Sequence, residues 1–481
     1  MARFISTSIP YVNAKPHLGH ALEFVQTDAY ARTARLSDPD VFFLTGTDDN
    51  ALKNVQAAEA AGKPVDEYVD EHAEHFKELE KRLGISYDDF IRTSTDERHR
   101  RGVEKFWRAM KAEDIYKKSY RGLYCVGCEE FKTEKELVNG ECPEHPGKKL
   151  EEIEEENYFF RLSAYQKELE ELIASDTIRV IPESRKNEAL SFIRGGLQDF
   201  SVSRSSVRAK GWGIPVPDDS DQYFYVWFDA LGNYITALGY AEESDIYQKY
   251  WVNGKEKTHA IGKGINRFHT VYWPAMLLSA GLPLPTSVFI HGYITSEGQK
   301  MSKSIGNVID PNDLLEKYGT DATRYLLLRH VHPTEDSDVT WERLDEWYTA
   351  NLVNGIGNLV ARVMKLAEEH LPSPVALTEA DTAIESVFTE KLDAFKFNEA
   401  MDLIFEHVGK GDEYMTEKEP YKKVKAEETK AEALADIEKL VRHLAKLAAH
   451  LRPVMPATAE VILAAVTENR KPENLFPRLD K

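Results

Sequence analysis

The sequence predicts an α/β protein with a parallel sheet, interrupted by an insertion and followed by an all-α helical bundle. Three observations predict this fold class. Short apolar runs, typical of buried parallel strands, alternate with helical patterns over residues 1–115 and again over residues 226–309. Residues 116–225 between them are rich in turns and hold all three cysteines. Beyond residue 347, nearly every segment has the apolar spacing of a helix.

The individual strands and helices follow from the length and period of the apolar runs. In the first α/β segment we expect strands over residues 3–8 and 41–44, a helix from about Leu18, and helices over residues 64–83 and 96–113. In the insertion we expect short strands over residues 120–130 and 149–162. In the second α/β segment we expect strands over residues 222–228, 258–261 and 287–293, and a helix over residues 268–280.

The carboxy-terminal part is predicted to be helical, because apolar stripes run along residues 351–370 and 437–451. The chain is therefore predicted to have five parts. They are the halves of the α/β domain at residues 1–115 and 226–309, the insertion at 116–225, a linker fold at 310–347, and a helical domain at 348–481.

Composition excludes several classes of protein. A hydrophobic fraction of 42% and a charged fraction of 30% are typical of a globular chain rather than a disordered one. The first residues resemble no secretory signal, and three cysteines do not make an extracellular disulfide framework, so we expect a cytoplasmic protein. The net charge of −20 argues against a surface that is basic throughout. It leaves room for a local basic groove that binds nucleic acid.

The cysteines form a pattern with one histidine that is typical of a metal site. Cys125 and Cys128 are spaced as C-x-x-C, and Cys142 and His145 as C-x-x-H. Three thiolates and an imidazole complete a tetrahedral Zn²⁺ shell, which leaves no open position for a substrate. The sequence therefore predicts one structural zinc, against the alternative of unrelated free cysteines.

Two further motifs indicate phosphate chemistry. His17 and His20 flank Gly19 where a helix is expected to begin, and a helix amino terminus favours anions. Lys300 and Lys303 lie in the string Lys-Met-Ser-Lys-Ser, where two lysines can stabilise the charge of a leaving pyrophosphate. Taken singly, the histidines fit surface or core positions, and the lysines fit a solvated basic loop.

Together these strings resemble the HIGH and KMSKS motifs of the class I aminoacyl-tRNA synthetase family. Residues 7–11, 212–217 and 225–230 are similar to its methionine branch. The resemblance implies a split Rossmann-type catalytic domain with a zinc-ribbon insertion and a helical anticodon-binding domain. It also implies ATP-dependent ligation of L-methionine to tRNA(Met) through methionyl-adenylate, with release of AMP and pyrophosphate.

The resemblance also implies the functional residues. His17, His20, Lys300 and Lys303 match catalytic positions, and with Gly19 and Gly262 they match the ATP site, where Mg²⁺ accompanies ATP. The methionine-binding positions correspond to Ile9, Tyr11, Asp48, Arg204, Trp227, Ala230, Tyr234, Ile265 and His269. Asp48 is expected to hold the α-ammonium group. Asn358, Arg362 and Tyr421 match anticodon-binding positions.

Three departures from the family pattern leave alternatives open. Asn50 stands where the family has a histidine, and Gly264 where it has an aspartate expected near the ATP ribose. The chain ends at Lys481 without the carboxy-terminal extension of some relatives, so we expect a monomer. The alternatives are a catalytically inactive tRNA-binding paralogue and a class I synthetase for another amino acid.

Overall fold

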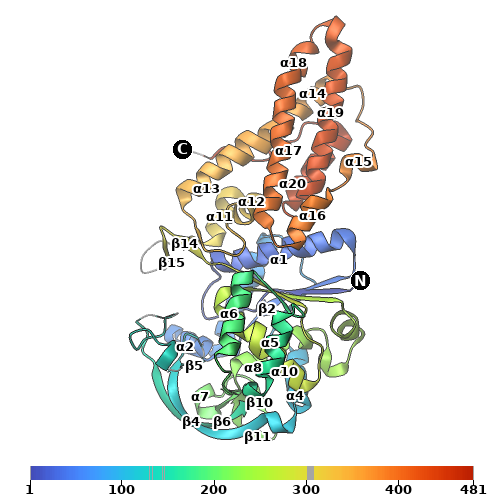
Figure 1. Cartoon of the computed structure of the whole chain (residues 1–481). Helices are drawn as coiled ribbons and strands as arrows, with labels where there is room; N and C mark the ends of the chain where they lie inside the picture. The colour runs from blue at the N-terminus through green and yellow to red at the C-terminus, as the bar shows by residue number, and fades with distance from the viewer. Residues whose placement is uncertain are drawn as a thin grey trace. The chain divides into compact units, whose positions relative to one another are not determined.

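The computed structural model describes residues 2–128, 130–132, 134–143, 145, 147–300 and 308–479. Its contacts divide the chain into two compact units (Figure 1). The sheet unit comprises Met1–Pro16, Asp40–Glu78 and Tyr87–His291. The helical unit comprises His17–Pro39, Leu79–Ser86 and Gly292–Lys481. These two units do not correspond one to one with the five parts predicted from the sequence, whose bounds stay a prediction.

The sheet unit is built on a six-stranded sheet with the strand order β3-β2-β1-β12-β13-β7. All of its pairings are parallel. The strands are β1 (Arg3–Ser6), β2 (Val41–Thr47), β3 (Asp89–Arg92), β7 (Arg179–Ile181), β12 (Glu256–Gly262) and β13 (Ser287–His291). The chain order reverses between β1 and β12, and ligands in such sheets bind outside the carboxyl ends of the strands at this point.

The chain segments between and around these strands form helices. They are α2 (Leu52–Ala61), α3 (Val65–Arg82), α4 (Glu97–Ala109), α5 (Gln166–Ala174), α6 (Glu183–Arg194), α8 (Val226–Thr236) and α10 (Trp273–Ala280). A 3₁₀ turn at Lys263–Ile265 and a π turn at Phe268–Tyr272 precede α10. The strand expected over residues 222–228 is partly wrong, because it ends at Phe224 and α8 begins at Val226.

The insertion adds two small antiparallel sheets and one strand of the main sheet. β4 (Ile115–Cys125) and β6 (Glu151–Phe160) form a long curved ribbon, flanked by β5 (Glu130–Lys132) and β8 (Phe200–Ser201) (Figure 1). The second sheet comprises β9 (Ser203–Ser205), β10 (Pro215–Val216) and β11 (Asp219–Phe224). β7 also comes from the insertion and pairs with β13 at the edge of the main sheet.

The helical unit is a bundle with a small sheet. Its longer helices are α1 (Leu18–Ser37), α14 (Asn358–His370), α17 (Phe397–Lys418), α19 (Glu427–Leu451) and α20 (Pro456–Glu468). The shorter helices are α11 (Pro311–Tyr318), α12 (Thr320–Arg329), α13 (Trp341–Trp347), α15 (Glu379–Thr382), α16 (Ser386–Asp393) and α18 (Pro420–Lys423). β14 (Ile294–Ser296), β15 (Gln299–Lys300) and β16 (Ser337–Asp338) form the sheet.

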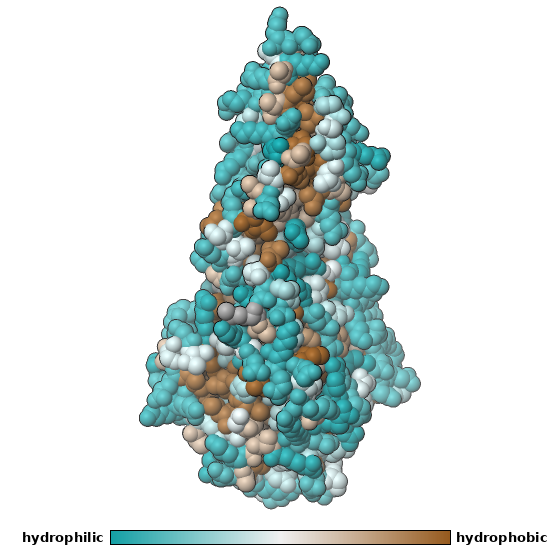
Figure 2. Space-filling view, turned by 90° about the vertical axis from the view of Figure 1, so that its right-hand side faces the viewer, coloured by the Kyte–Doolittle hydropathy of each residue, from teal (hydrophilic) through white to brown (hydrophobic). Residues whose placement is uncertain are grey.

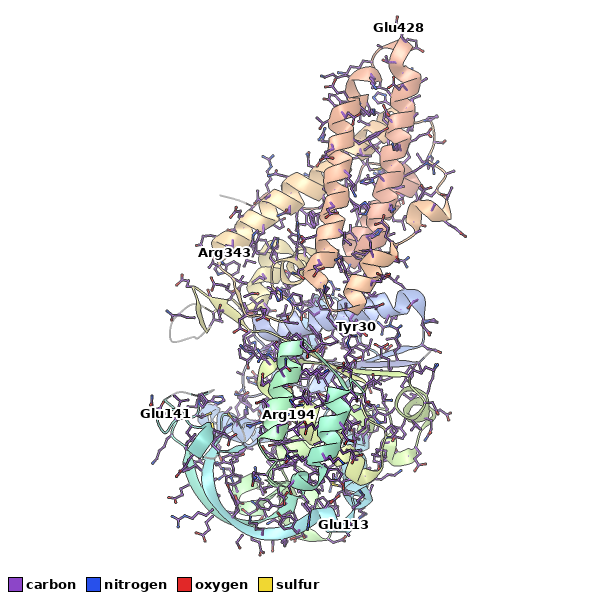
Figure 3. All side chains as sticks on the ribbon, in the orientation of Figure 1. Tyr30, Glu113, Glu141, Arg194, Arg343 and Glu428 are labelled. Atoms are coloured by element: carbon purple, nitrogen blue, oxygen red, sulfur yellow. The ribbon has the colours of Figure 1, made fainter. Side chains whose placement is uncertain are left out.

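Helix α1 is an interior element of the helical unit. Asp28 and Arg324 form an ion pair over 2.7 Å with both side chains 0% exposed, and Tyr30, labelled in Figure 3, stacks on Phe395. Burial alone would raise the pKa of Asp28, but Arg324, Arg32 and hydrogen bonds from Ser86 hold it below its usual range. These contacts fix the helix whose first turn carries the predicted phosphate-binding histidines.

The surface agrees with the acidic, polar composition of the chain. Figure 2 shows a face on which hydrophilic residues predominate and apolar ones gather in smaller areas. Within the described residues, no helix combines the length and the apolar character needed to cross a bilayer. The predicted fold class, a parallel-sheet α/β unit with an insertion and a carboxy-terminal helical region, is confirmed.

Candidate active site

Aromatic side chains gather in the sheet unit beyond the carboxyl ends of β1 and β12. Trp227 of α8 stacks on Phe268, with ring centroids 3.8 Å apart and an interplanar angle of 6°. Tyr11 meets the edge of Trp227 at 6.2 Å, and His269 lies 6.4 Å from the same indole. The result is a compact apolar wall with polar atoms at its margin.

His269 is held in one orientation by two partners. Its Nδ1 lies 3.0 Å from the carbonyl oxygen of Ile265, and its Nε2 lies 2.7 Å from the hydroxyl of Tyr234. A carbonyl oxygen can only accept, so Nδ1 carries the proton, and in the neutral ring Nε2 accepts from the tyrosine. His269 and Tyr234 are both 1% exposed. The pair therefore presents a fixed polar edge beside Trp227.

The predicted methionine-binding residues largely come together here. Tyr11 bridges to Asp48 across the ends of β1 and β2, and Ala230 lies on α8 between Trp227 and Tyr234. Ile9, Tyr11 and Ile265 pack against the same hydrophobic core as these aromatic residues.

A row of carboxylates lies next to the aromatic wall. Asp48 and Asp49 follow β2, and both are at most 2% exposed. Arg92 pairs with Asp49 at 2.7 Å. Asp229, on α8, accepts hydrogen bonds from Asn50 Nδ2 at 2.7 Å and from His99 Nε2 at 2.6 Å. The two oxygens of the buried Asp229 carboxyl thus each have a partner.

Asp48, unlike Asp49, forms no ion pair with a lysine or arginine among the described residues. Burial raises the pKa of its carboxyl well above the usual range, and the charges of Asp229 and Asp49 raise it further. The backbone N–H of Asn50, which donates to this carboxyl, and the charge of Lys53 lower the pKa, but they offset only part of the increase. An ammonium group placed beside Asp48 would therefore favour its ionised form.

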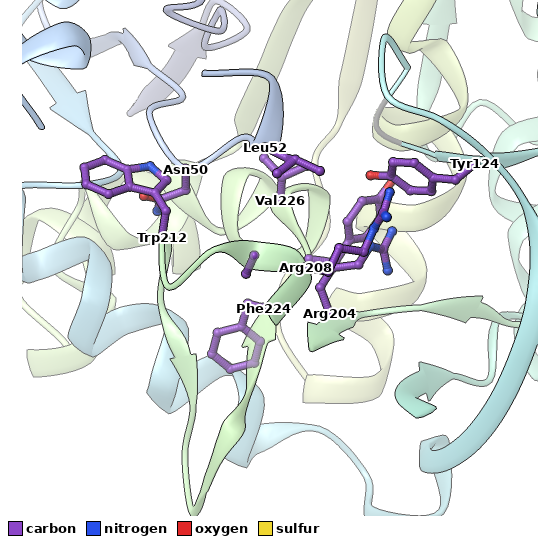
Figure 4. A pocket seen from close by; sticks show the side chains of 10 residues that line it. Asn50, Leu52, Tyr124, Arg204, Arg208, Trp212, Phe224 and Val226 are labelled. Carbon is purple, nitrogen blue, oxygen red and sulfur yellow. The ribbon is translucent and has the colours of Figure 1, made fainter. Parts of the chain in front are cut away.

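Arg204 lies beside the aromatic wall rather than in it. Its guanidinium donates to Ser201 Oγ and the Ser203 carbonyl and covers the ring of Tyr225 at 4.0 Å. It lines a pocket with Asn50, Leu52, Tyr124, Arg208, Trp212, Phe224 and Val226. Figure 4 shows Asn50 and Trp212 on one side of this pocket and Arg204, Arg208 and Tyr124 on the other. Arg204 thus lines the same pocket as Asn50 and Val226, which lie close in the chain to Asp48 and Trp227.

His17 and His20 lie in the helical unit, at the start of α1. Their rings stack with centroids 3.7 Å apart, and the backbone N–H of His17 donates to His20 Nδ1 at 3.1 Å. A Cβ atom at Gly19 would lie 3.0 Å from the His17 ring, so glycine leaves the room that this stack needs. The two predicted phosphate ligands therefore form one unit at a helix amino terminus.

The remaining predicted ATP-site residues are only partly described. Gly262 ends β12, paired with His291 of β13, and Gly264 lies in the 3₁₀ turn that follows. Lys300 belongs to β15. Residues 301–307, including Lys303, lie outside the described residues, as does the side chain of Lys300.

The four predicted zinc ligands are brought together in the insertion. One ligand atom from each of Cys125, Cys128, Cys142 and His145 lies within 4.8 Å of the others. Cys128 Sγ is 3.4 Å from Cys142 Sγ and 3.3 Å from His145 Nδ1, and metal–ligand bonds of about 2.0–2.3 Å give such separations in a tetrahedron. This Cys₃His cluster is compatible with Zn²⁺.

Lys53 connects the cluster with the aromatic wall. Its Nζ donates to the carbonyl of Gly127, between Cys125 and Cys128, at 2.9 Å. The same ammonium lies 3.6 Å from the centroid of the Tyr11 ring. Lys53 therefore joins the metal-binding turn to a predicted methionine-site residue.

The predicted anticodon residues lie on two helices of the helical unit. Asn358 and Arg362 are one turn apart on α14, and Arg362 contacts Asp412 of α17 at 3.4 Å. Tyr421 lies on the short α18, where Lys422 pairs with Glu419 and Lys423 with Glu432.

Sequence reasoning missed His99. No motif surrounds this residue, and its 0% exposure and contact with Asp229 arise only when α4 packs on α8. Gly102, one turn further along α4, permits this packing because a Cβ there would lie 2.3 Å from a Thr236 methyl group.

Comparison with known proteins identifies the class to which this fold and these motifs belong. A family model described as "tRNA synthetases class I (M)" matches residues 3–153 and 145–364. The Methionine--tRNA ligase of Thermotoga maritima is 41% identical, over 98% of this chain and 76% of that protein. That of Brucella melitensis biotype 1 is 41% identical, over 97% of this chain and 93% of that protein.

Solved structures that resemble this chain belong to the same class of protein. Mycobacterium tuberculosis methionyl-tRNA synthetase in complex with methionyl-adenylate matches with a TM-score of 0.89 and 37% identity, over 96% of this chain and 93% of that chain. The apo form of that synthetase matches with a TM-score of 0.83 and 33% identity, over 100% of this chain and 98% of that chain. The chain therefore belongs to the methionine family of class I tRNA synthetases, and the resemblance found in its sequence is confirmed.

Proposed function

We propose that this chain ligates L-methionine to tRNA(Met) in two steps. The methionine carboxylate attacks the α-phosphorus of ATP, giving methionyl-adenylate and pyrophosphate. The terminal adenosine of the tRNA then attacks the adenylate, giving methionyl-tRNA and AMP. The observation that carries the proposal is the buried site in which an aromatic wall meets the Asp48 carboxyl, in a chain of this family.

The methionine side chain is proposed to lie against Tyr11, Trp227 and the His269–Tyr234 pair. Contacts between sulfur and aromatic rings favour a thioether by about 0.3–1.5 kcal/mol each. Asp48 binds the α-ammonium, and Ile9, Ala230 and Ile265 complete the apolar surface. Arg204 is proposed to bound the methionine site on the side where it lines the pocket of Figure 4.

ATP is proposed to bind through residues of both motifs. His17, Gly19 and His20 receive phosphate at the amino terminus of α1, where N–H groups and the helix dipole favour anions. Gly262 lets the nucleotide approach the end of β12. Lys300 and Lys303, with Mg²⁺ brought by ATP, stabilise the charge that develops on pyrophosphate. Catalysis then depends mainly on positioning and electrostatics.

Zn²⁺ is proposed to occupy the Cys₃His cluster. Its role is structural, because three thiolates and one imidazole close the tetrahedron. The bond from Lys53 to Gly127 makes the turn between Cys125 and Cys128 a support for the Tyr11 ring.

The tRNA is proposed to contact the helical part at residues 348–481. Asn358 and Arg362 can hydrogen-bond to unstacked anticodon bases, and Tyr421 can stack on one. We further propose that the chain acts as a monomer in the cytoplasm. The catalytic domain is proposed to comprise residues 1–115 and 226–309, with the insertion at 116–225 and the linker fold at 310–347.

Methionine-dependent exchange of label between pyrophosphate and ATP tests the first step. Exchange with methionine, at least tenfold weaker with leucine, isoleucine, valine and cysteine and lost in Lys303→Ala, would support the proposal. Exchange that prefers another amino acid would indicate a different synthetase. No exchange from zinc-loaded protein that binds tRNA would indicate an inactive tRNA-binding paralogue, the alternative that Gly264 keeps open.

A further inference from the structure

Three metal-ligating side chains meet in the helical unit, and the proposed function uses none of them. Glu385 immediately precedes α16, His407 lies on α17, and His450 lies near the end of α19. One ligand atom from each lies within 4.8 Å of the other two. His407 Nε2 lies 3.5 Å from Glu385 Oε2, a separation that suits two ligands of one ion.

His450 is already oriented as metal-binding histidines usually are. Its Nδ1 donates to the carbonyl oxygen of Lys446 at 2.8 Å, which fixes the ring and directs the Nε2 lone pair toward Glu385. The backbone N–H of Glu385 donates a hydrogen bond to this Nε2 at 3.2 Å, at the long end of the usual range. A modest movement of the segment before α16 would break this hydrogen bond and leave His450 Nε2 available to bind an ion.

The burial of the cluster also suits a metal site. His450 is 0% exposed and His407 is 9% exposed. Two neutral imidazoles and one carboxylate are the forms in which these groups bind metal.

The surrounding groups define which ion fits. Lys446 Nζ lies 2.6 Å from Glu385 Oε1, so it competes with an ion and leaves Oε2 as the available oxygen. His443 is engaged elsewhere, with its Nε2 2.7 Å from the carbonyl of His407. Lys410 is a further nearby cation. Two imidazole nitrogens and one carboxylate oxygen favour zinc-like ions over Mg²⁺ or Ca²⁺.

We propose that Glu385, His407 and His450 bind one divalent transition-metal ion, with Zn²⁺ as the physiological candidate. The ion joins the start of α16 to α17 and α19, and water completes its coordination. Because Lys446 competes for the carboxylate, the site is weaker than the Cys₃His cluster and exchanges its metal more readily.

Titration with Co²⁺ of the 481-residue chain loaded with one equivalent of Zn²⁺, which the tighter Cys₃His cluster takes, tests this proposal. We expect one further equivalent of Co²⁺ to bind, with weak visible bands of nitrogen and oxygen ligation and without the intense near-ultraviolet absorption of cobalt–thiolate bonds. His407→Gln and His450→Gln should each weaken this binding by at least about tenfold, the scale of losing a metal-site partner. Lys446→Gln should strengthen it.

His443→Gln is the matched control, because it alters a neighbouring buried histidine that lies outside the ligand set. Glu385→Gln is a third ligand variant, at a partly exposed position, and it keeps the proposal testable if His450→Gln does not fold. Absence of a further Co²⁺ equivalent would overturn the proposal. So would binding that survives unchanged in His407→Gln and Glu385→Gln, or that His443→Gln weakens equally.

Discussion

Asn50 donates from Nδ2 to Asp229 Oδ2 over 2.7 Å, joining the loop after β2 to helix α8. Asn50 is one of the residues at which the sequence departs from the pattern that it resembles. That pattern predicts a histidine there, which is also a hydrogen-bond donor. Together with His99, which contacts Oδ1 at 2.6 Å, Asn50 satisfies both oxygens of a carboxyl that is 0% exposed. The substitution is therefore accommodated within a complete hydrogen-bond network.

Replacing Asn50 with alanine should destabilise the fold. The change leaves a buried Asp229 oxygen unsatisfied, so the free energy of unfolding should fall by about 1.5–3 kcal/mol. Urea unfolding measures the loss. Asn253→Ala removes a hydrogen bond from an exposed asparagine to the Gln248 carbonyl, and it should cost less than about 1 kcal/mol. Equal losses in the two variants would contradict the role assigned to Asn50.

Asp48→Asn should stabilise the free protein while it abolishes methionine binding. Because the pKa of Asp48 is raised in the folded state, the native chain binds more protons than the unfolded chain above the ordinary aspartate pKa. The free energy of unfolding of the unmodified chain therefore falls as the pH rises from the ordinary aspartate pKa toward the raised pKa of Asp48. The neutral amide of the variant should recover at least about 1 kcal/mol of this lost stability. Thermal unfolding at pH 7.5 and calorimetric titration with methionine measure the two effects. A less stable variant, or one that retains methionine affinity, would refute this account.

Tyr234→Phe should weaken methionine recognition more than it slows the reaction. The hydroxyl fixes His269 Nε2 at 2.7 Å, and losing one such bond corresponds to about 1 kcal/mol, or about fivefold in the KM for methionine. Steady-state pyrophosphate exchange separates KM from kcat. Tyr318→Phe is a matched control, since its hydroxyl bonds to Asp345 in the helical unit. A lower kcat at unchanged KM would assign Tyr234 a different role.

Asp28→Asn should be strongly destabilising at neutral pH. The variant leaves Arg324 charged and buried without its partner, which costs about 3–5 kcal/mol. The pKa of Asp28 is lowered in the folded state, so its contribution is present above the ordinary aspartate value and is lost as pH falls through the lowered one. Unfolding of both proteins between pH 7 and pH 2.5 should show a difference that shrinks in acid.

The matched control for Asp28 is Asp40→Asn. Asp40 pairs with Lys249, and both side chains are nearly half exposed. Its removal should cost far less than the removal of Asp28, because solvent and salt screen an exposed ion pair. A comparable loss in the two variants would mean that the burial of the Asp28–Arg324 pair is energetically unimportant.

The strands of the parallel sheet could be predicted because they are buried on both faces and therefore read as short apolar runs. The same property misled the prediction at Val226–Phe228. In α8 every residue is buried, so an apolar run there has no helical period to distinguish it from a strand. β7, with three residues, is too short to give a pattern.

The aromatic residues and the cysteines of the candidate site could be found because they lie in recognisable strings. His99 could not, because its contact with Asp229 joins positions 130 residues apart on two helices. The roles of Lys300 and Lys303 rest on the sequence motif and stay a prediction, since residues 301–307 lie outside the described residues.

Attachment of labelled methionine to tRNA tests the central claim most directly. Purified chain, ATP and Mg²⁺ should esterify methionine to a tRNA(Met) transcript, and a transcript with an altered anticodon should be charged far more slowly. Lys303→Ala should abolish charging of both. Formation of methionyl-adenylate without transfer, or charging that prefers another amino acid, would contradict the account.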